Sequence, residues 1–223
     1  MADLAVVIEQ GKKRAFASAV DWPGWARIGR DEADAIEGLL AYAPRYEHVV
    51  ARHRLGFEAP SDVKVVERLG GNATTDYGAP DMPAASETAP VGEDELKRLQ
   101  TILSASWGAL ARAVEAADGK ALQKGPRGGG RTVEGMVQHV LNAHYAYLRH
   151  IFWREKQPPT KGLAGMLDGL KQADAAAMAF ATSDEMPEKG PRGNALWTPR
   201  YFVRRAAWHI LDHAWEIEDK VID

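Results

Sequence analysis

The chain has 223 residues, of which 45% are hydrophobic and 26% are charged, so it has room for one large globular domain or two small ones. It contains no cysteine, which excludes disulfides, thiolate metal sites and a cysteine nucleophile and leaves His, Asp and Glu as metal ligands. The formal net charge is −3 and neither half has the large excess of basic residues expected of a nucleic-acid-binding protein, which argues against that class. No apolar stretch approaches the roughly 18 residues of a membrane span and the N-terminus lacks a basic n-region, so we expect a cytoplasmic protein without membrane contact.

The first part of the chain is expected to form a small α+β module. Residues 4–9 and 14–20 are apolar segments separated by a turn, which predicts a β-hairpin. The acidic run at residues 31–34 suits the first turn of a helix, and Pro44 is expected to kink or restart that helix. Residues 63–69 predict a third strand.

Residues 70–91 are rich in Gly, Pro, Ala, Ser and Thr and follow no hydrophobic period. Such composition is typical of a connection between structural units. We therefore divide the chain into a module of residues 1–85 and a helical unit of residues 86–223.

The helical unit contains four amphipathic stretches separated by Gly and Pro. The first covers about residues 93–117, the second begins at Thr132, and the third follows residues 158–160. The fourth begins at Thr198, a suitable N-cap, with Pro199 at the first helical position. Modest loops between helices of this size predict an all-α, up-down-up-down four-helix bundle, a fold whose core commonly holds metal sites.

Two histidines, His209 and His213, stand four residues apart in the fourth helix. Side chains at this spacing differ by about 40° around the helix axis and about 6 Å along it, so both imidazoles can reach one metal ion. The pattern is not the zincin motif, because Ile210 and not glutamate follows the first histidine. A catalytic metal usually takes three protein ligands, so a third ligand must come from another element.

The second helix offers histidines for that role. Its buried face is marked at helical spacing by Val133, Met136, Val140, Tyr147 and Ile151. His144 falls close to this apolar stripe, His139 lies on its flank, and His150 faces away from it.

The second half of the chain resembles the DinB-like family of metal-binding four-helix bundles, some members of which are similar to thiol-dependent transferases. Residues 132–140 look like the second-helix pattern of that family, in which Ser or Thr opens the helix and a ligand histidine follows two turns later. Residues 209–213 match its HxxxH pattern. The resemblance implies His139, His209 and His213 as the three metal ligands.

The depth of these histidines along their helices does not agree if the second and fourth helices run in parallel. His139 lies about 10 Å beyond Thr132, whereas His209 lies about 16 Å beyond Thr198. His144 would match the depth of His209 better. Helix stagger can absorb the difference, so His139 is the predicted third ligand and His144 is the alternative.

Two similar basic loops, residues 124–128 and residues 189–193, precede the second and fourth helices. In an up-down-up-down bundle they lie at the same end. Turn formation with solvated charges is one explanation, and an anion-binding rim near two helix N-termini is the other. The candidate anion ligands are Arg127, Arg192 and Arg200.

Two carboxylates in the fourth helix, Asp212 and Glu216, are candidates to orient the imidazole N–H groups. For Asp212 the alternative, a solvated helix charge, is equally good.

The first half resembles HicB-like antitoxin domains through Trp22-Pro23-Gly24-Trp25 after a hairpin and the acidic helix start that follows. Such modules are associated with partner or RNA-related binding. This half is acidic and has no attached DNA-binding segment, so we favour an accessory module that covers the bundle or mediates homodimerisation.

These features together predict a metal-dependent enzyme acting on a small-molecule substrate, either a hydrolase or a thiol-dependent S-transferase. Zn²⁺ or Ni²⁺ held by neutral imidazoles would lower the pKa of water or of a thiol. Because the chain has no cysteine, the thiol would be an external low-molecular-weight cosubstrate. The alternative is a non-catalytic binding or stress-response module with a structural or vacant metal site.

Overall fold

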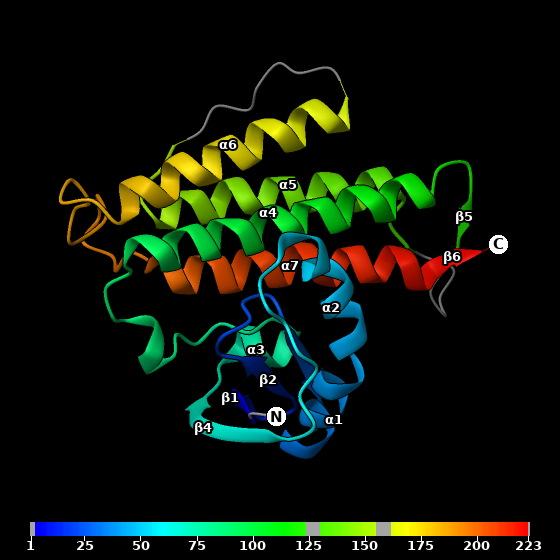
Figure 1. Cartoon of the computed structure of the whole chain (residues 1–223), viewed down its shortest axis with the longest axis horizontal. Helices are drawn as coiled ribbons and strands as arrows, with labels where there is room; N and C mark the ends of the chain where they lie inside the picture. The colour runs from blue at the N-terminus through cyan, green and yellow to red at the C-terminus, as the bar shows by residue number, and fades with distance from the viewer. Residues whose placement is uncertain (1–2, 124–129, 155–161, 223) are drawn as a thin grey trace.

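The chain is a mixed α/β protein with its sheet in the N-terminal part and mostly helices afterwards, as the sequence predicts at this coarse level (Figure 1). The computed structural model describes residues 3–123, 130–154 and 162–222. None of the helices in these ranges is both long and apolar enough to cross a membrane.

The N-terminal sheet has the strand order β3-β2-β1-β4, from β1 (Leu4–Gln10), β2 (Ala15–Ala19), β3 (Ala26–Gly29) and β4 (Val63–Gly70). Strands β1 and β2 pair antiparallel, which confirms the predicted hairpin, and β4 runs parallel to β1. Strand β3 was not predicted, because four residues directly after a turn are too few to show a period of two.

Two short helices follow the sheet's first three strands. Helix α1 (Glu32–Ala41) is capped by Asp31, whose side chain accepts a 3.0 Å hydrogen bond from the backbone N–H of Asp34. Helix α2 (Ala43–Val50) has Pro44 in its first turn, so the expected restart is confirmed. Leu39 of α1 is buried in one cluster with the alternating apolar residues of β1 and β2.

The segment between β4 and the long helices is not an extended linker. This segment contains α3 (Ala73–Tyr77) and a 3-10 turn at Ala85–Glu87. Another 3-10 turn, Ala51–His53, lies before β4 and follows α2 directly. Glu87 pairs with Arg204 across 117 residues of sequence. The division of the chain near residue 85 stays a prediction.

The helical part is built from α4 (Glu93–Ala116), α5 (Val133–His150), α6 (Leu163–Ala181) and α7 (Pro199–Lys220). Both predicted N-caps are confirmed. The hydroxyl of Thr132 accepts from the N–H of Gly135 at 3.1 Å, and that of Thr198 accepts from the N–H of Tyr201 at 3.3 Å.

The predicted up-down-up-down order of these helices is wrong. Strands β5 (Ala121–Leu122) and β6 (Val221–Ile222) pair directly after α4 and α7, so these two helices finish at the same end. The N–H of Trp197 donates to the carbonyl of His150 at 2.8 Å, so α5 ends where α7 begins.

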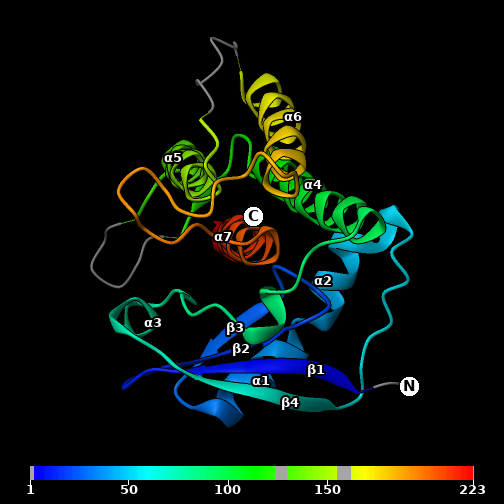
Figure 2. The same ribbon diagram turned by 90° about the vertical axis from the view of Figure 1, so that its left-hand side faces the viewer.

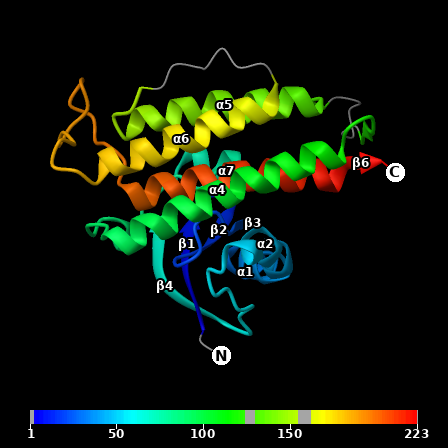
Figure 3. The ribbon, with the colours of Figure 1, turned by 45° about the horizontal axis from the view of Figure 1, so that its top comes forward.

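Helix α6 runs in the same direction as α5, because Phe180 near its C-terminal end contacts Trp153 just after α5, with ring centroids 5.9 Å apart (Figures 1 and 3). Residues 151–162 separate the two helices, and a chain of that length reaches up to roughly 40 Å, beyond the roughly 28 Å length of α6. A connection of this length can return the chain to the starting end of α5, whereas the prediction took modest loops to imply antiparallel neighbours.

Helix α7 lies between the sheet and the other long helices (Figure 2). On the sheet side Trp208 meets Phe16 of β2 edge to face, with ring centroids 5.8 Å apart. On the other side Phe202 and Ile210 belong to the core shared with α4, α5 and α6. Every residue from Tyr201 to Leu211 is buried, so α7 forms the common core of the two layers.

The close approach of the β2–β3 turn to α7 predicts a specific stability defect. Gly24 has φ +92°, and an added Cβ would lie 2.8 Å from the Cβ of Ala207. Gly56 also has positive φ, +69°, but nothing lies within 4 Å of its added Cβ. We expect Gly56→Ala to lower the free energy of unfolding by about 1–2 kcal/mol through backbone strain alone. Gly24→Ala should lose roughly 1–3 kcal/mol more through overpacking.

Urea denaturation of both variants measures the difference. Equal losses in the two variants would show that the turn does not press against α7.

Candidate metal centre

Three histidines from two helices converge at one point. His139 comes from α5, and His209 and His213 come from adjacent turns of α7. One nitrogen from each ring can be chosen so that all three lie within 4.8 Å of one another. The ring centroids are 4.8–5.1 Å apart, and the Nε2 atoms of His139 and His209 are separated by 3.2 Å.

These distances suit a shared metal ion. Zn²⁺ binds imidazole nitrogens at about 2.0–2.1 Å in tetrahedral geometry, which places two ligand nitrogens roughly 3.4 Å apart. The 3.2 Å separation between His139 and His209 is close to that value. The three histidines can therefore hold a metal ion, whose identity the donor set alone does not fix.

The antiparallel course of α5 and α7 explains why His139 meets the pair on α7. His139 lies eleven residues, about 16 Å, before His150 at the C-terminal end of α5. His209 lies ten residues, about 15 Å, beyond Pro199 at the N-terminal end of α7. Because these two ends are adjacent, the depths agree, and the mismatch calculated for parallel helices does not arise.

Burial favours the neutral, metal-binding form of two imidazoles of this cluster, those of His139 and His209. His209 and His213 are each 8% exposed. Burial lowers the pKa of His209 to about 2, and the charges of His213 and Arg205 add to the effect. Burial also lowers the pKa of His139, with Arg131 and His213 contributing. Neutral imidazoles offer their lone pairs without first losing a proton.

Glu216 fixes the orientation of one ligand. Its Oε2 lies 2.8 Å from Nδ1 of His213 and, as a carboxylate, can only accept, so Nδ1 carries the proton and Nε2 is left for the cluster. This hydrogen bond lowers the pKa of Glu216 to about 2, and a second contact from Lys220 contributes. A carboxylate that accepts the second N–H of an imidazole is the contact that commonly accompanies metal-binding histidines.

Asp212, the other predicted orienting carboxylate, faces the sheet. It accepts a hydrogen bond from Arg27 of β3 at 3.2 Å, an ion pair that joins α7 to the N-terminal layer. Neighbouring positions on a helix point about 100° apart, which separates Asp212 from the face that carries His213.

His144, the alternative ligand, lies in a different polar contact. It is 1% exposed, and its Nε2 lies 2.5 Å from Oδ1 of Asp174 on α6. The other oxygen of Asp174 accepts from the indole N–H of Trp107 at 2.9 Å. His144 therefore links α5 to α6 and α4, and the three-histidine group does not include it.

Of the three predicted anion-binding arginines, the structure describes Arg192 and Arg200. Arg127 lies outside the described residues, and Arg192 is exposed in the loop before α7. The residues that flank the first basic loop, Gln123 and Arg131, line one cavity, and Gln123 bonds to Lys220 at the far end of α7. Residues 124–128 themselves lie outside the described residues, but α5 and α7 are antiparallel, so the two helices that the basic loops precede begin at opposite ends.

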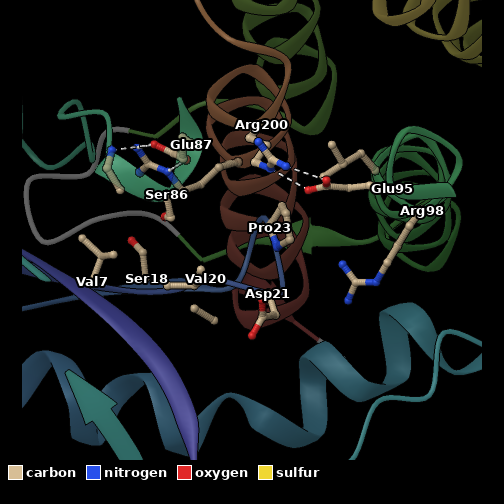
Figure 4. Close-up of a pocket in the computed structure, with 14 residues that line it drawn as sticks. Val7, Ser18, Val20, Asp21, Pro23, Ser86, Glu87, Glu95, Arg98 and Arg200 are labelled. Atoms are coloured by element: carbon tan, nitrogen blue, oxygen red, sulfur yellow. Dashed lines mark hydrogen bonds and ion pairs between the residues drawn. The ribbon is translucent and has the colours of Figure 1, made fainter. Parts of the chain in front are cut away.

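Arg200 lines a cavity of 280 Å³ between the sheet and the start of α7 (Figure 4). Its guanidinium makes two 2.5 Å hydrogen bonds to Glu95 and also contacts the carbonyls of Ala89 and Pro90. Arg204 in the same cavity is paired with Glu87. Arg200 therefore connects α7 to α4 and is not a free anion ligand.

One residue beside the cluster was missed by the sequence analysis. Arg205 lies four residues before His209 and is 7% exposed. Arg205 continues the four-residue spacing of His209 and His213 one turn toward the N-terminus of the helix. This spacing is the sequence signal from which it could have been found.

Comparisons of this chain with family models, with curated proteins and with solved structures find no match. The DinB-like and HicB-like resemblances therefore stay predictions that rest on the quoted motifs.

Replacement of any one cluster histidine by alanine should remove metal binding. With two ligands left, we expect Zn²⁺ and Ni²⁺ affinity to fall by more than the roughly 10–100-fold that is typical of losing an outer partner. Titration calorimetry and metal analysis of His139→Ala, His209→Ala and His213→Ala check this. His48→Ala, at an exposed position on α2, is the matched control.

His144→Phe separates the two candidate third ligands. The variant should bind metal like the unmodified chain, while losing stability because the buried Oδ1 of Asp174 loses its partner. Loss of metal stoichiometry in His144→Phe and not in His139→Ala would reverse the ligand assignment.

Glu216→Gln tests the orienting contact. The amide does not hold the Nδ1–H of His213 as a carboxylate does, so metal affinity should fall about 10–100-fold with the fold intact. The control is Glu218→Gln, which removes a partner of Arg45 away from the cluster. Equal affinities in both variants would contradict a role for Glu216.

Proposed function

We propose that this chain is a metal-dependent enzyme that acts on a small molecule, with His139, His209 and His213 as the ligands of Zn²⁺ or Ni²⁺. The reaction is either hydrolysis or transfer of an external low-molecular-weight thiol. The observation that carries the proposal is the convergence of three imidazoles, two of them buried, from two antiparallel helices.

The donor set favours a catalytic over a structural site. Structural zinc sites are closed by four protein ligands, whereas catalytic sites use three and keep one position for water or substrate. Within the described residues the group contains three ligands and no further carboxylate. His139 is less buried than the other two, so the cluster is most open on the α5 side.

The surrounding residues are suited to hold the ligands still. Glu216 keeps the proton of His213 on Nδ1, and burial keeps His209 neutral. A divalent ion at this point supplies Lewis acidity, which makes water or a thiol a better nucleophile near neutral pH. The chain has no cysteine, so a thiol nucleophile must arrive with a cosubstrate.

The helical part supports the proposed relation to DinB-like proteins. We infer that α4, α5, α6 and α7 correspond to the four-helix bundle of that family. Helix α5 would carry one ligand histidine, His139, and α7 the HxxxH pair. The N-terminal layer would then be an accessory module that covers one side of α7, through contacts such as Phe16–Trp208.

A non-catalytic role is favoured by one observation. The three ligands join α5 to α7, two helices that also meet through the Trp197–His150 hydrogen bond, so a metal ion could serve to fasten them. In that case removal of the ion would destabilise the fold without any loss of turnover.

Two assays on the metal-loaded chain distinguish these functions. p-Nitrophenyl acetate tests hydrolysis, and glutathione with 1-chloro-2,4-dinitrobenzene tests thiol transfer. We expect one activity to appear with Zn²⁺ or Ni²⁺ and to fall by about 100-fold or more after chelation or in His213→Ala, equivalent to about 2.7 kcal/mol of barrier.

X-ray absorption of the loaded protein provides the structural test. Three nitrogen ligands with an exchangeable light atom support an enzyme. A closed shell of four protein ligands, with no turnover in either assay, would favour the fastening role.

A further inference from the structure

Arg205 lies on the same face of α7 as the two histidines of the cluster. The residues Arg205, His209 and His213 follow each other at intervals of four, so each is about 6 Å farther along the axis and about 40° farther around it. Arg205 therefore lies one helical turn before His209. The charge of its guanidinium contributes to the lowered pKa of His209.

The guanidinium of Arg205 is buried, and it has no anionic partner among the residues that the structure describes. The side chain is 7% exposed, and its Nε and Nη1 atoms are buried with no hydrogen-bond acceptor among the residues that the structure describes. Arg204, the next residue back, is equally buried but is paired with Glu87, and Arg200 is paired with Glu95. A buried charge without such a partner is costly, and it is uncommon in proteins.

Aromatic rings compensate the charge only in part. Arg205 lies over Tyr147 at 5.3 Å and over Trp208 at 4.8 Å. These contacts attract the positive charge through the ring faces, but they do not accept N–H bonds in the guanidinium plane. The same two rings also contact His209, at 5.8 and 6.1 Å, so Arg205 and the cluster share one environment.

Asp81, a nearby carboxylate, does not take the role of partner. Its charge acts on Tyr147 and Tyr201, but its Oδ2 accepts from Asn72 at 2.7 Å, and no ion pair joins it to Arg205. Within the described residues Nε and Nη1 of Arg205 are therefore buried donors without an acceptor.

We propose that Arg205 binds an anionic group, a carboxylate or a phosphate, of the small molecule whose reacting part lies at the three histidines. This inference rests on the proposed function for the reacting part, but the anion contact itself needs no metal. The proposed substrate is a small molecule that carries an anionic group. Arg205 of α7, one turn from His209, recognises that group. This residue differs from the three anion ligands that the sequence predicts, Arg127, Arg192 and Arg200.

Calorimetric titration of the whole chain tests the proposal with two simple probes, succinate for a carboxylate and inorganic phosphate. Phosphate is used with the metal-free protein only, since it precipitates Zn²⁺. We expect Arg205→Gln to weaken the binding of the preferred probe by about 10-fold or more, because the lost hydrogen bonds involve two charged groups. Arg205→Lys, which keeps the charge, should retain part of the affinity, and Arg192→Gln is the exposed control.

The stability of the ligand-free protein distinguishes binding from a structural role. If Arg205 is held for a ligand, Arg205→Met should leave the thermal midpoint unchanged or raise it, because an uncompensated buried charge is removed. A lower midpoint in Arg205→Met, together with equal probe affinities in Arg205→Gln and the unmodified chain, would overturn the proposal.

Failure of the metal site gives a different result. His213→Ala should lose metal while still binding the probe in its metal-free form. If instead metal binds normally but neither probe binds in any form, the anion contact is wrong and the metal centre stands.

Discussion

The burial of α7 is the constraint on which the rest of this structure depends. The helix carries a mixed sequence with arginines, histidines and carboxylates, yet its residues from Tyr201 to Leu211 are all removed from solvent. A helix in this position needs an acceptor or donor for every polar side chain, because a buried group without one costs on the order of 1–3 kcal/mol. The sheet covers one side of α7, and α4, α5 and α6 cover the opposite side. These two layers supply partners for most of the buried polar groups of α7.

The pairs are distributed over both layers. Glu87 and Glu95 neutralise Arg204 and Arg200 near the start of α7, and Asp212 joins the middle of α7 to the sheet through Arg27. One face of α7 carries the two imidazoles that meet His139 and the guanidinium of Arg205, whose Nε and Nη1 have no hydrogen-bond acceptor among the described residues. Perturbed and incompletely paired polar groups of this kind mark functional sites, because the structure would otherwise be more stable without them. The proposed metal and anion sites lie on this face.

Two of the histidines of α5, His139 and His144, illustrate why the third ligand could not be chosen from spacing. His139 and His144 are five residues apart, which corresponds to about 140° around the helix. One therefore faces α7, while the other faces α6 and pairs with Asp174. An apolar stripe identifies the buried face of a helix, but both of these histidines border buried surface. The choice between them depends on which helix, α6 or α7, covers each side of α5. The direction of α5 relative to α7 determines this.

The sequence by itself determined the local features. Thr132 and Thr198 begin their helices because their hydroxyls accept backbone N–H groups, Pro44 restarts a helix in its first turn, and His209 and His213 share a face through the helical period. Only the tertiary structure decided the long-range features: that α5 runs antiparallel to α7, that Arg200 is paired with Glu95, and that Arg205 is not paired within the described residues. The physical reason is the distance along the chain over which each kind of interaction acts. Caps and periodicity act within one or two turns, whereas ligand sets and ion pairs join residues whose distance along the chain, 70 residues for His139 and His209, says nothing of their distance in space.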